Sequence, residues 1–405
     1  MRRPRHLSTL LAAATVTVAP WAHAAPEVLV TFEQAIALSR GMAPDVVVAR
    51  GRESVANAEI GVAGVYPNPT AFGGTSTQAA KLSLGVSVPL VILGQRGAAI
   101  RAARADLDTV RTDTAAVQND VRTASAKAFI ALWHAERTAT ARAEAAALAR
   151  RIEGAVGGRV ELGAAPAVEG LRVHAERLRA DADAEEAAEL VNAAGADLAR
   201  YIGVAVDQPV RAKGDPQVPD VAPPIDALLG RAAANPTIRR EELDARAAEA
   251  RVLRERALVR PALTLDLGVD AYDPTLGATN YRAQLGVEVP IFNQRGAFID
   301  RERANAAQAQ SRAGAQKTRL TAGLVAAYRT FGAVSARRKA LEEGVVPAAD
   351  AAANATEESY TLGHSPLVAV LDAERARVEA HLALIDARAA RANAWADVEQ
   401  AAGWP

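Results

Sequence analysis

The chain contains one short motif twice, as Leu84-Gly85-Val86-Ser87-Val88-Pro89 and as Leu285-Gly286-Val287-Glu288-Val289-Pro290. Each copy alternates apolar residues with small or polar ones, as a half-buried strand does, and then stops at a proline, which cannot donate to a strand ladder. Gln, Arg, Gly and Ala follow at residues 95–98 and again at residues 294–297, each time before a long Ala-, Arg- and Glu-rich stretch. The sequence therefore predicts, twice, a strand that leads into a long helix.

The repetition extends over most of the chain, since Leu162-Gly163 matches Leu362-Gly363 and Pro166 matches Pro366, about 200 residues later. That period is far longer than the periods of solenoids and propellers, so it indicates a duplicated domain. We expect an α+β fold that is mainly α, with one helix–strand–strand–helix unit in residues 25–203 and another in residues 225–405. The proline-rich residues 204–224 form the predicted linker between the two units.

Residues 1–24 have the pattern of a secretory signal peptide, with a basic start, an apolar run over residues 7–19 and a cleavage site at Ala22-His23-Ala24. No later stretch has the length of an apolar membrane helix. The chain has no cysteine, which excludes disulfides, thiolate metal sites and a lipidated N-terminal cysteine. Removal of the signal leaves 44 basic against 47 acidic residues, so nucleic acid is not an expected partner.

Long helices dominate the prediction. In the first unit they cover residues 32–64 with a kink at Pro44, residues 95–152, and residues 167–201 after a bend that begins at Gly154 and ends at Pro166. In the second unit they cover residues 225–260, 295–345 with an extension to 360, and 367–400. The helix over residues 95–152 would be about 90 Å long at 1.5 Å per residue, which indicates a coiled-coil or tubular assembly.

The predicted strands lie at about residues 70–91 in the first unit and at about residues 263–292 in the second, where they cover residues 263–272 and 281–292. Their side-chain pattern indicates contact with a membrane. The apolar residues of each strand point to one face and the polar residues to the other, over about ten residues, which is the pattern of an outer-membrane barrel. The residues expected to face the barrel lumen are Asp266, Asp270, Arg282, Gln284 and Glu288. An ordinary soluble sheet packed on helices is the alternative for any single strand.

Four strands cannot close a barrel alone, and unpaired strand edges are not tolerated in lipid. If these strands span an outer membrane, several chains must share one barrel. The pattern itself does not decide how many chains take part.

The ordered set of motifs resembles the TolC-type outer-membrane factors of bacterial tripartite efflux and secretion systems. The resemblance rests on Thr31-Phe32-Glu33-Gln34-Ala35-Ile36, the two strand–proline motifs, the two Leu-Gly tips and Val370-Leu371-Asp372-Ala373. It implies a homotrimer with a twelve-stranded β-barrel in the outer membrane and a long α-helical barrel in the periplasm. It also implies a periplasmic adaptor protein and an inner-membrane RND-type pump as partners.

Gly94-Gln95-Arg96-Gly97 and the segment 290–296 are most similar to the heavy-metal efflux branch of that family. The expected function is therefore a passive export duct for divalent heavy-metal cations. The same duct serving drug or organic-compound efflux, or type I protein secretion, remains an alternative. A periplasmic coiled-coil scaffold is a more distant one.

An enzyme is a third possible class of function, beside an export duct and a scaffold. The sequence contains no catalytic triad order, phosphate loop or zinc motif. No catalytic residue, cofactor or metal site is therefore predicted. The histidines that follow the signal peptide are His134, His174, His364 and His381. They are scattered, and we interpret them as solvated or lumenal.

Two sets of residues are candidate functional sites. The tips at Leu162, Gly163, Leu362 and Gly363 lie far from the strands and are candidate docking points for the adaptor. By resemblance, Asp372 faces the pore and forms an acidic ring that gates the periplasmic end, although Ala369 stands where relatives often have a second acid. An exposed aspartate near a helix start, where the helix dipole favours it, is the alternative for Asp372.

Overall fold

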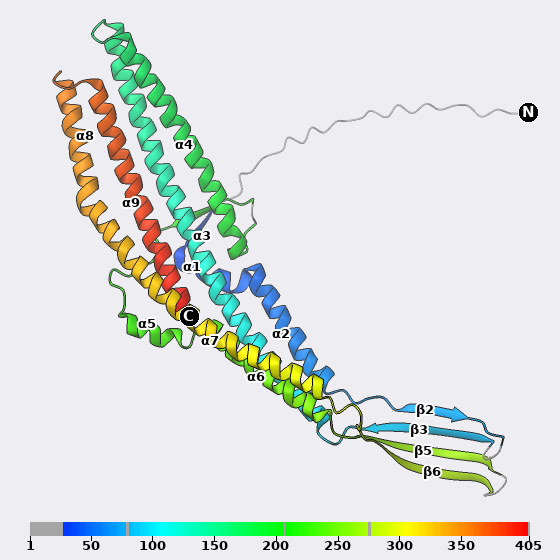
Figure 1. Cartoon of the computed structure of the whole chain (residues 1–405). Coiled ribbons are helices and arrows are strands. Elements are labelled where there is room, and N and C mark those ends of the chain that lie inside the picture. The colour runs from blue at the N-terminus through cyan, green and yellow to red at the C-terminus, as the bar shows by residue number, and fades with distance from the viewer. Residues whose placement is uncertain (1–26, 78–80, 206, 274–276, 404–405) are drawn as a thin grey trace, which may run out of the picture.

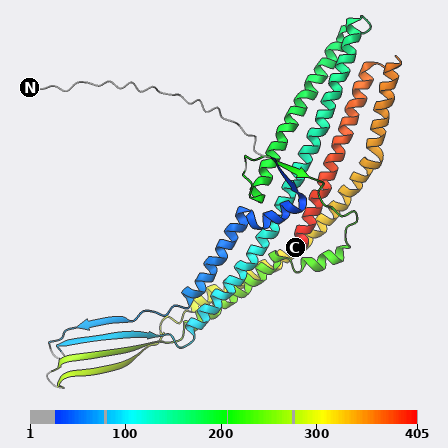
Figure 2. The ribbon, with the colours of Figure 1, turned by 180° about the vertical axis from the view of Figure 1, so that it is seen from behind.

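The computed structural model describes residues 27–77, 81–205, 207–273 and 277–403. The chain forms one long, bent body with a sheet at one end and two helical hairpins at the other (Figure 1). The view from behind shows the same arrangement, with the sheet and the hairpin tips at opposite ends (Figure 2). The predicted signal sequence, residues 1–24, lies outside the described residues.

The two units repeat one order of elements. The first unit contains β1 (Val28–Thr31), α1 (Phe32–Met42), α2 (Pro44–Ala63), β2 (Thr70–Gly74), β3 (Leu82–Leu90), α3 (Gln95–Glu161) and α4 (Ala167–Ile202). After β4 (Val210–Lys213), the second unit contains α5 (Ile225–Ala232), α6 (Pro236–Ala257), β5 (Ala262–Asp273), β6 (Gly277–Glu288), α7 (Gly296–Ala340), a π-helical turn η1 (Leu341–Val345), α8 (Val346–Thr361) and α9 (Leu367–Ala402). Each hairpin consists of the tip half of a long helix and the helix that returns beside it.

Helix α3 has 67 residues and extends for about 100 Å. The predicted end at residue 152 was wrong, because the helix continues through Gly154, Gly157 and Gly158 to Glu161. Glycine inside a helix costs about 1 kcal/mol relative to alanine, but tertiary packing can override that preference. Here Val156 is buried in a cluster with Val173 of α4 and Leu367 of α9, so packing holds the glycine-containing turn in the helix.

The two helices that precede the strands are broken where single helices were predicted. The breaks occur at Ala43 and Asn235, which are in extended backbone conformations with ψ angles of 134° and 131°. Each residue directly precedes a proline, and a following proline disfavours helical backbone. The equivalent prolines of the two units thus begin α2 and α6 rather than kinking a continuous helix.

The π-helical turn η1 accounts for a difference in length between the two units. Gln95 and Gln294 are 199 positions apart, whereas Leu162 and Leu362 are 200 apart, so the second long helix has one extra residue. A π-type turn accommodates one extra residue inside a helix, and the N–H of Val346 donates to the carbonyl oxygen of Leu341, five residues earlier. The insertion is therefore absorbed just before Pro347, and α8 stays packed on α9.

The main sheet is antiparallel with strand order β2-β3-β5-β6. Strands β2 and β3 lie where they were predicted, whereas β6 begins and ends about four residues earlier than the predicted strand over residues 281–292. The predicted stop at the proline of each motif was right for β6, which ends at Glu288 before Pro290, but wrong for β3, which continues through Pro89 to Leu90 because a proline is tolerated near a strand end.

The predicted linker contains a strand that the sequence analysis missed. Strand β4 pairs in parallel with β1, so that Val28 lies opposite Val210. This small sheet packs against a core of buried side chains near the middle of the body, which includes Phe129 of α3 and Leu198 of α4. The linker therefore fastens the N-terminal segment to the helices as well as joining the two units.

Candidate functional site

The four-stranded sheet has one apolar face, and its register aligns the apolar residues across β3, β5 and β6. The aligned rows are Leu84, Val269 and Tyr281; Val86, Leu267 and Ala283; Val88, Leu265 and Leu285; and Leu90, Leu263 and Val287. The sheet projects beyond the helices (Figure 1), and Tyr281 and Leu285 are 87% and 59% exposed. A continuous apolar surface of this kind marks a contact with lipid or with another protein.

The opposite face carries the five residues predicted to face a lumen, and the structure places all five on it. Asp266 lies opposite Gln284, and Glu288 lies opposite Ala262 at the end of the strands next to the helices. Asp270 accepts a hydrogen bond of 2.7 Å from Ser83 Oγ and lies 3.2 Å from Arg282 Nη1. The polar face therefore carries one neutralised pair and two further carboxylates.

The glycines of the repeated motif have a specific steric role that the sequence analysis did not find. A Cβ atom at Gly85 would lie 2.3 Å from the ring of Phe72, and one at Gly286 would lie 2.4 Å from Thr264 Oγ1. In each copy, a side chain of the neighbouring strand thus occupies the space above the glycine. The occurrence of glycine at the same position of both motifs was the sequence signal that could have revealed this role.

The two tips have the same backbone structure. Gly163 and Gly363 adopt left-handed conformations with φ angles of 71° and 80°. At each tip the glycine N–H and the next N–H donate back to the helix, as in a Schellman motif, and Leu162 and Leu362 remain 85% and 64% exposed. Both tips therefore present a leucine and a glycine at the far end of the molecule from the sheet (Figure 1).

The two hairpins are joined just behind their tips. Val156 and Val173 of the first hairpin pack against Leu367 and Leu371 of the second. The guanidinium of Arg159 lies 5.0 Å from the centre of the Tyr360 ring, so a cation–π contact also links the hairpins.

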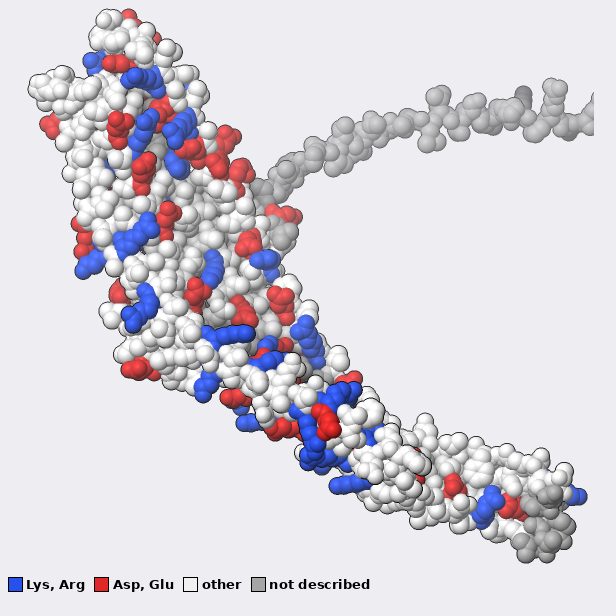
Figure 3. Space-filling model, viewed as in Figure 1, with Lys and Arg blue, Asp and Glu red and all other residues white. Residues whose placement is uncertain are grey.

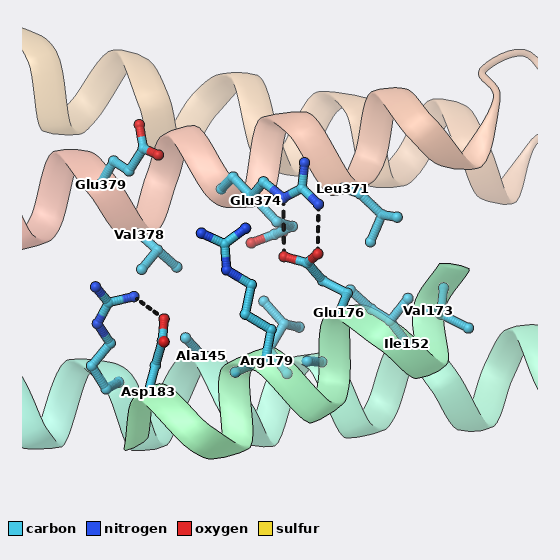
Figure 4. A pocket seen from close by; sticks show the side chains of 15 residues that line it. Ala145, Ile152, Val173, Glu176, Arg179, Asp183, Leu371, Glu374, Val378 and Glu379 are labelled. Atoms are coloured by element: carbon cyan, nitrogen blue, oxygen red, sulfur yellow. Dashed lines mark hydrogen bonds and ion pairs between the residues drawn. The ribbon is translucent and has the colours of Figure 1, made fainter. Parts of the chain in front are cut away.

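A cleft of about 330 Å³ lies between α3, α4 and α9 beyond this apolar contact (Figure 4). Arg375 of α9 crosses it and binds Glu176 of α4 through two hydrogen bonds, the first of 3.0 Å from Nε to Oε1. Arg142 of α3 donates to Asp183 of α4 at 2.9 Å. The hydrogen bond from Arg375 holds the pKa of Glu176 below its usual range. The pair of Arg375 and Glu176 thus connects the two hairpins on this side, whereas the pair of Arg142 and Asp183 joins the two helices of the first hairpin.

Glu374 is the unusual group in the cleft, and the sequence analysis did not predict it. It is only 6% exposed, and burial raises the pKa of its carboxyl group above the usual range. Arg377 Nη2 lies 2.7 Å from Oε2, but within the described part of the chain neither oxygen accepts a hydrogen bond. No sequence signal distinguished it from the many exposed glutamates on these helices.

Asp372, the candidate gate residue, lies at the surface near the start of α9. Its side chain is 65% exposed, and its Oδ1 lies 3.6 Å from Arg375 Nη1. Arg375 also binds Glu176, so it is shared between the two carboxylates. The exposure of Asp372 fits both a pore-facing residue and an ordinary helix-end charge.

Three of the four histidines connect pairs of helices, which the interpretation as solvated side chains did not anticipate. His134 bonds to Asp386 at 2.7 Å, His174 to Glu153 at 2.7 Å and His381 to Asp350 at 2.9 Å. In the described ranges, no cluster of three or more His, Cys, Asp or Glu residues has the arrangement of a metal site. Over the same ranges, no helix combines the length and apolar character that a membrane span requires.

The chain is similar to a protein family and to a curated protein in sequence, and to solved structures in fold. Residues 230–404 match the sequence model of the family described as outer membrane efflux protein. The cobalt-zinc-cadmium resistance protein CzcC of Cupriavidus metallidurans is 26% identical over 359 residues, which cover 87% of this chain and 85% of that protein.

Two solved structures have the same fold. CusC superimposes with a TM-score of 0.77 at 16% identity, covering 92% of each chain. The outer membrane protein VceC of Vibrio cholerae has a TM-score of 0.74 at 17% identity, covering 92% of this chain and 96% of its own. Together with the duplicated motifs, these similarities confirm the resemblance inferred from the sequence, with the second half of the chain matching the outer membrane efflux protein family and the whole chain sharing the fold of solved outer membrane proteins.

Proposed function

We propose that the protein is the outer-membrane channel subunit of a tripartite efflux system, a passive duct that leads from a periplasmic adaptor and an inner-membrane RND-type pump to the exterior. The two-faced sheet carries this proposal. Its apolar face is exposed and its other face holds Asp266, Asp270, Arg282, Gln284 and Glu288. A strand with one lipid-facing side and one water-facing side is the element of a membrane barrel.

We propose that the protein forms a homotrimer, because one chain by itself leaves surfaces that further copies would cover. Among the described residues, the outer strands β2 and β6 each pair on one side only. Unpaired backbone groups cost several kcal/mol each in lipid. Along α2, Val48, Val55 and Val62 are spaced by seven residues and are 55%, 63% and 63% exposed. This spacing is that of a helix–helix seam. Both the sheet and the helices thus offer surfaces for further copies, and the number three comes from the resemblance.

The tips are the proposed docking points for the adaptor. Leu162, Gly163, Leu362 and Gly363 form two equivalent turns at the end of the body away from the sheet. A Cβ atom at Gly163 or at Gly363 would meet no atom within 4 Å. The turns are therefore open to a partner's close approach.

Asp372 is the proposed gate residue. In a trimer, three exposed copies near the tips would form an acidic ring, and rings of carboxylates favour cations over anions in a narrow passage. The neighbouring Arg375 offsets part of this charge for as long as it stays within 3.6 Å of Asp372.

Divalent heavy-metal cations are the proposed cargo. This assignment rests on the relative described as a cobalt-zinc-cadmium resistance protein, which matches most of the chain. We expect a strain without this protein to become sensitive to cobalt, zinc or cadmium, and the intact gene to restore growth. Growth assays with these salts and with hydrophobic drugs make the comparison. Sensitivity to drugs alone would contradict the metal assignment and leave the duct intact.

A further inference from the structure

Arginine gathers where the helical body meets the sheet. Four segments form this junction, residues 55–69, 92–105, 253–262 and 289–303, and we call them the junction collar. The collar contains nine arginines and no lysine, against the four carboxylates Glu59, Glu255, Asp300 and Glu302. Basic side chains cluster at this level in Figure 3, whereas the sheet beyond it is mostly uncharged. The excess of positive charge is therefore local, in a chain whose overall charges balance.

Some of these arginines fix the sheet to the helices. Arg96 donates to the carbonyl oxygen of Gly64 at 2.7 Å and stacks on Tyr66 at 4.5 Å. Arg295 Nε donates to Glu255 at 3.1 Å, and Arg260 donates to the carbonyl oxygen of Leu93. These contacts explain why the repeated motif carries an arginine at the start of each long helix.

Other collar arginines have no such role. Arg101, Arg104 and Arg256 are exposed, and none of them makes an ion pair or hydrogen bond within the described part of the chain. Three free guanidinium groups in one band therefore remain available to an external anion.

Exposed apolar side chains occupy the same band. Ile92 and Ile291 are 68% and 69% exposed, Phe292 is fully exposed and Tyr66 is 61% exposed. Ile92 and Ile291 come directly after the apolar series of β3 and β6 along the chain. Apolar and aromatic side chains beside basic ones suit the boundary between hydrocarbon and head groups, where each kind finds a partner.

We propose that the junction collar binds anionic phospholipid head groups of the periplasmic leaflet of the outer membrane and so sets the depth at which the sheet sits. This inference rests on the proposed function, which puts the sheet in that membrane. Guanidinium groups match phosphate oxygens in charge and geometry. Each basic residue near an anionic bilayer strengthens binding by roughly fivefold.

The test uses the full-length protein purified in detergent, with dioleoylphosphatidylglycerol, dioleoylphosphatidylcholine or inorganic phosphate as the probe. Lipid retained by the protein is counted by native mass spectrometry over a titration. The variant carries Arg101→Gln, Arg104→Gln and Arg256→Gln. The matched control carries Arg172→Gln, Arg239→Gln and Arg329→Gln, which are exposed arginines on the helices away from the collar.

We expect the wild type and the control to prefer phosphatidylglycerol over phosphatidylcholine, and the collar variant to lose affinity for phosphatidylglycerol by about tenfold or more. Inorganic phosphate should not displace the lipid at equal concentration. Equal binding by the collar variant, an equal loss in the control, displacement by phosphate, or no lipid preference in the wild type would each overturn the proposal. Membrane fractionation distinguishes a failure of the lipid-binding proposal from a failure of the proposed channel function. A wild-type protein absent from the outer membrane would refute the proposed function itself.

Discussion

Gln284 and Leu285 are neighbours on β6 whose side chains lie on opposite faces of the sheet. Leu285 is opposite Leu265 on the apolar face, and Gln284 is opposite Asp266 on the polar face. Leu285→Arg should destabilise the membrane-inserted state by about 2–4 kcal/mol, because arginine on a lipid face is costly near the midplane. Gln284→Arg is the matched control and should insert normally. Urea unfolding in lipid vesicles measures both, and equal tolerance would show that the two faces are misassigned.

Glu374 couples the hairpin contact to pH. Burial raises its pKa above the ordinary value of 4.5, so the folded protein keeps this proton at pH values where the unfolded chain has lost it. The contribution of Glu374 to stability therefore falls as the pH rises from about 4.5 through the raised pKa. This direction is opposite to that of Glu176, whose lowered pKa makes its contribution fall as the pH becomes acidic.

Glu374→Gln should remove the loss of stability that Glu374 causes as the pH rises from about 4.5, because an amide does not ionise at these pH values. We expect the variant's thermal midpoint to change less than that of the wild type between pH 4.5 and neutrality. Glu185→Gln, an exposed position on α4 outside the cleft, is the matched control for the change of side chain. Thermal melts followed by circular dichroism give the comparison. Parallel profiles for the wild type and Glu374→Gln would mean that Glu374 does not titrate in this window.

At the scale of elements, two substitutions at a tip turn can distinguish a role in the fold of the turn from a role in docking a partner. A side chain at Gly363 meets open space but must adopt a φ angle of 80°, which costs roughly 1–2 kcal/mol for any L-residue. Gly363→Ala and Gly363→Trp therefore share the strain and differ in bulk. We expect Trp to abolish export and Ala to retain most of it, with both variants trimeric. Metal-resistance assays and gel migration report the two properties, and the same loss in both variants would point to a turn that is only structural.

The elements that could be predicted from sequence are those with a strong local signal. Alternation located β3 and β5, the absence of proline identified the long helices, and glycine with proline marked both tips. The breaks at Ala43 and Asn235 had a local signal as well, in the prolines that follow, but it was interpreted as a kink in the first unit and missed in the second.

The remaining features depend on packing between distant segments. Helix α3 passes through Gly157 because Val156 is held by Leu367, more than 200 residues away in sequence. Strand β4 exists because β1 pairs with it. Glu374 lies in a cleft that forms where α9 of the second hairpin meets α3 and α4 of the first. A window of neighbouring residues contains none of this information.

At the scale of the whole molecule, the chain is a long body with two unfinished surfaces. The sheet ends in the open edges of β2 and β6, and its apolar face is exposed. A soluble protein would cover that face or blunt those edges. Both features are explained together if equivalent chains complete one barrel in a membrane.

Disulfide trapping between β2 and β6 tests this claim most directly, since the natural chain has no cysteine. Ala71→Cys is combined in turn with Ala283→Cys, Leu285→Cys or Val287→Cys, three positions on the same face of β6. Each double variant is expressed separately, and its outer membranes are oxidised. At least one of the three should give a covalent trimer on a denaturing gel, whereas Ala71→Cys alone should stay monomeric. Monomers from all three pairs, in protein that is otherwise folded, would contradict the shared barrel.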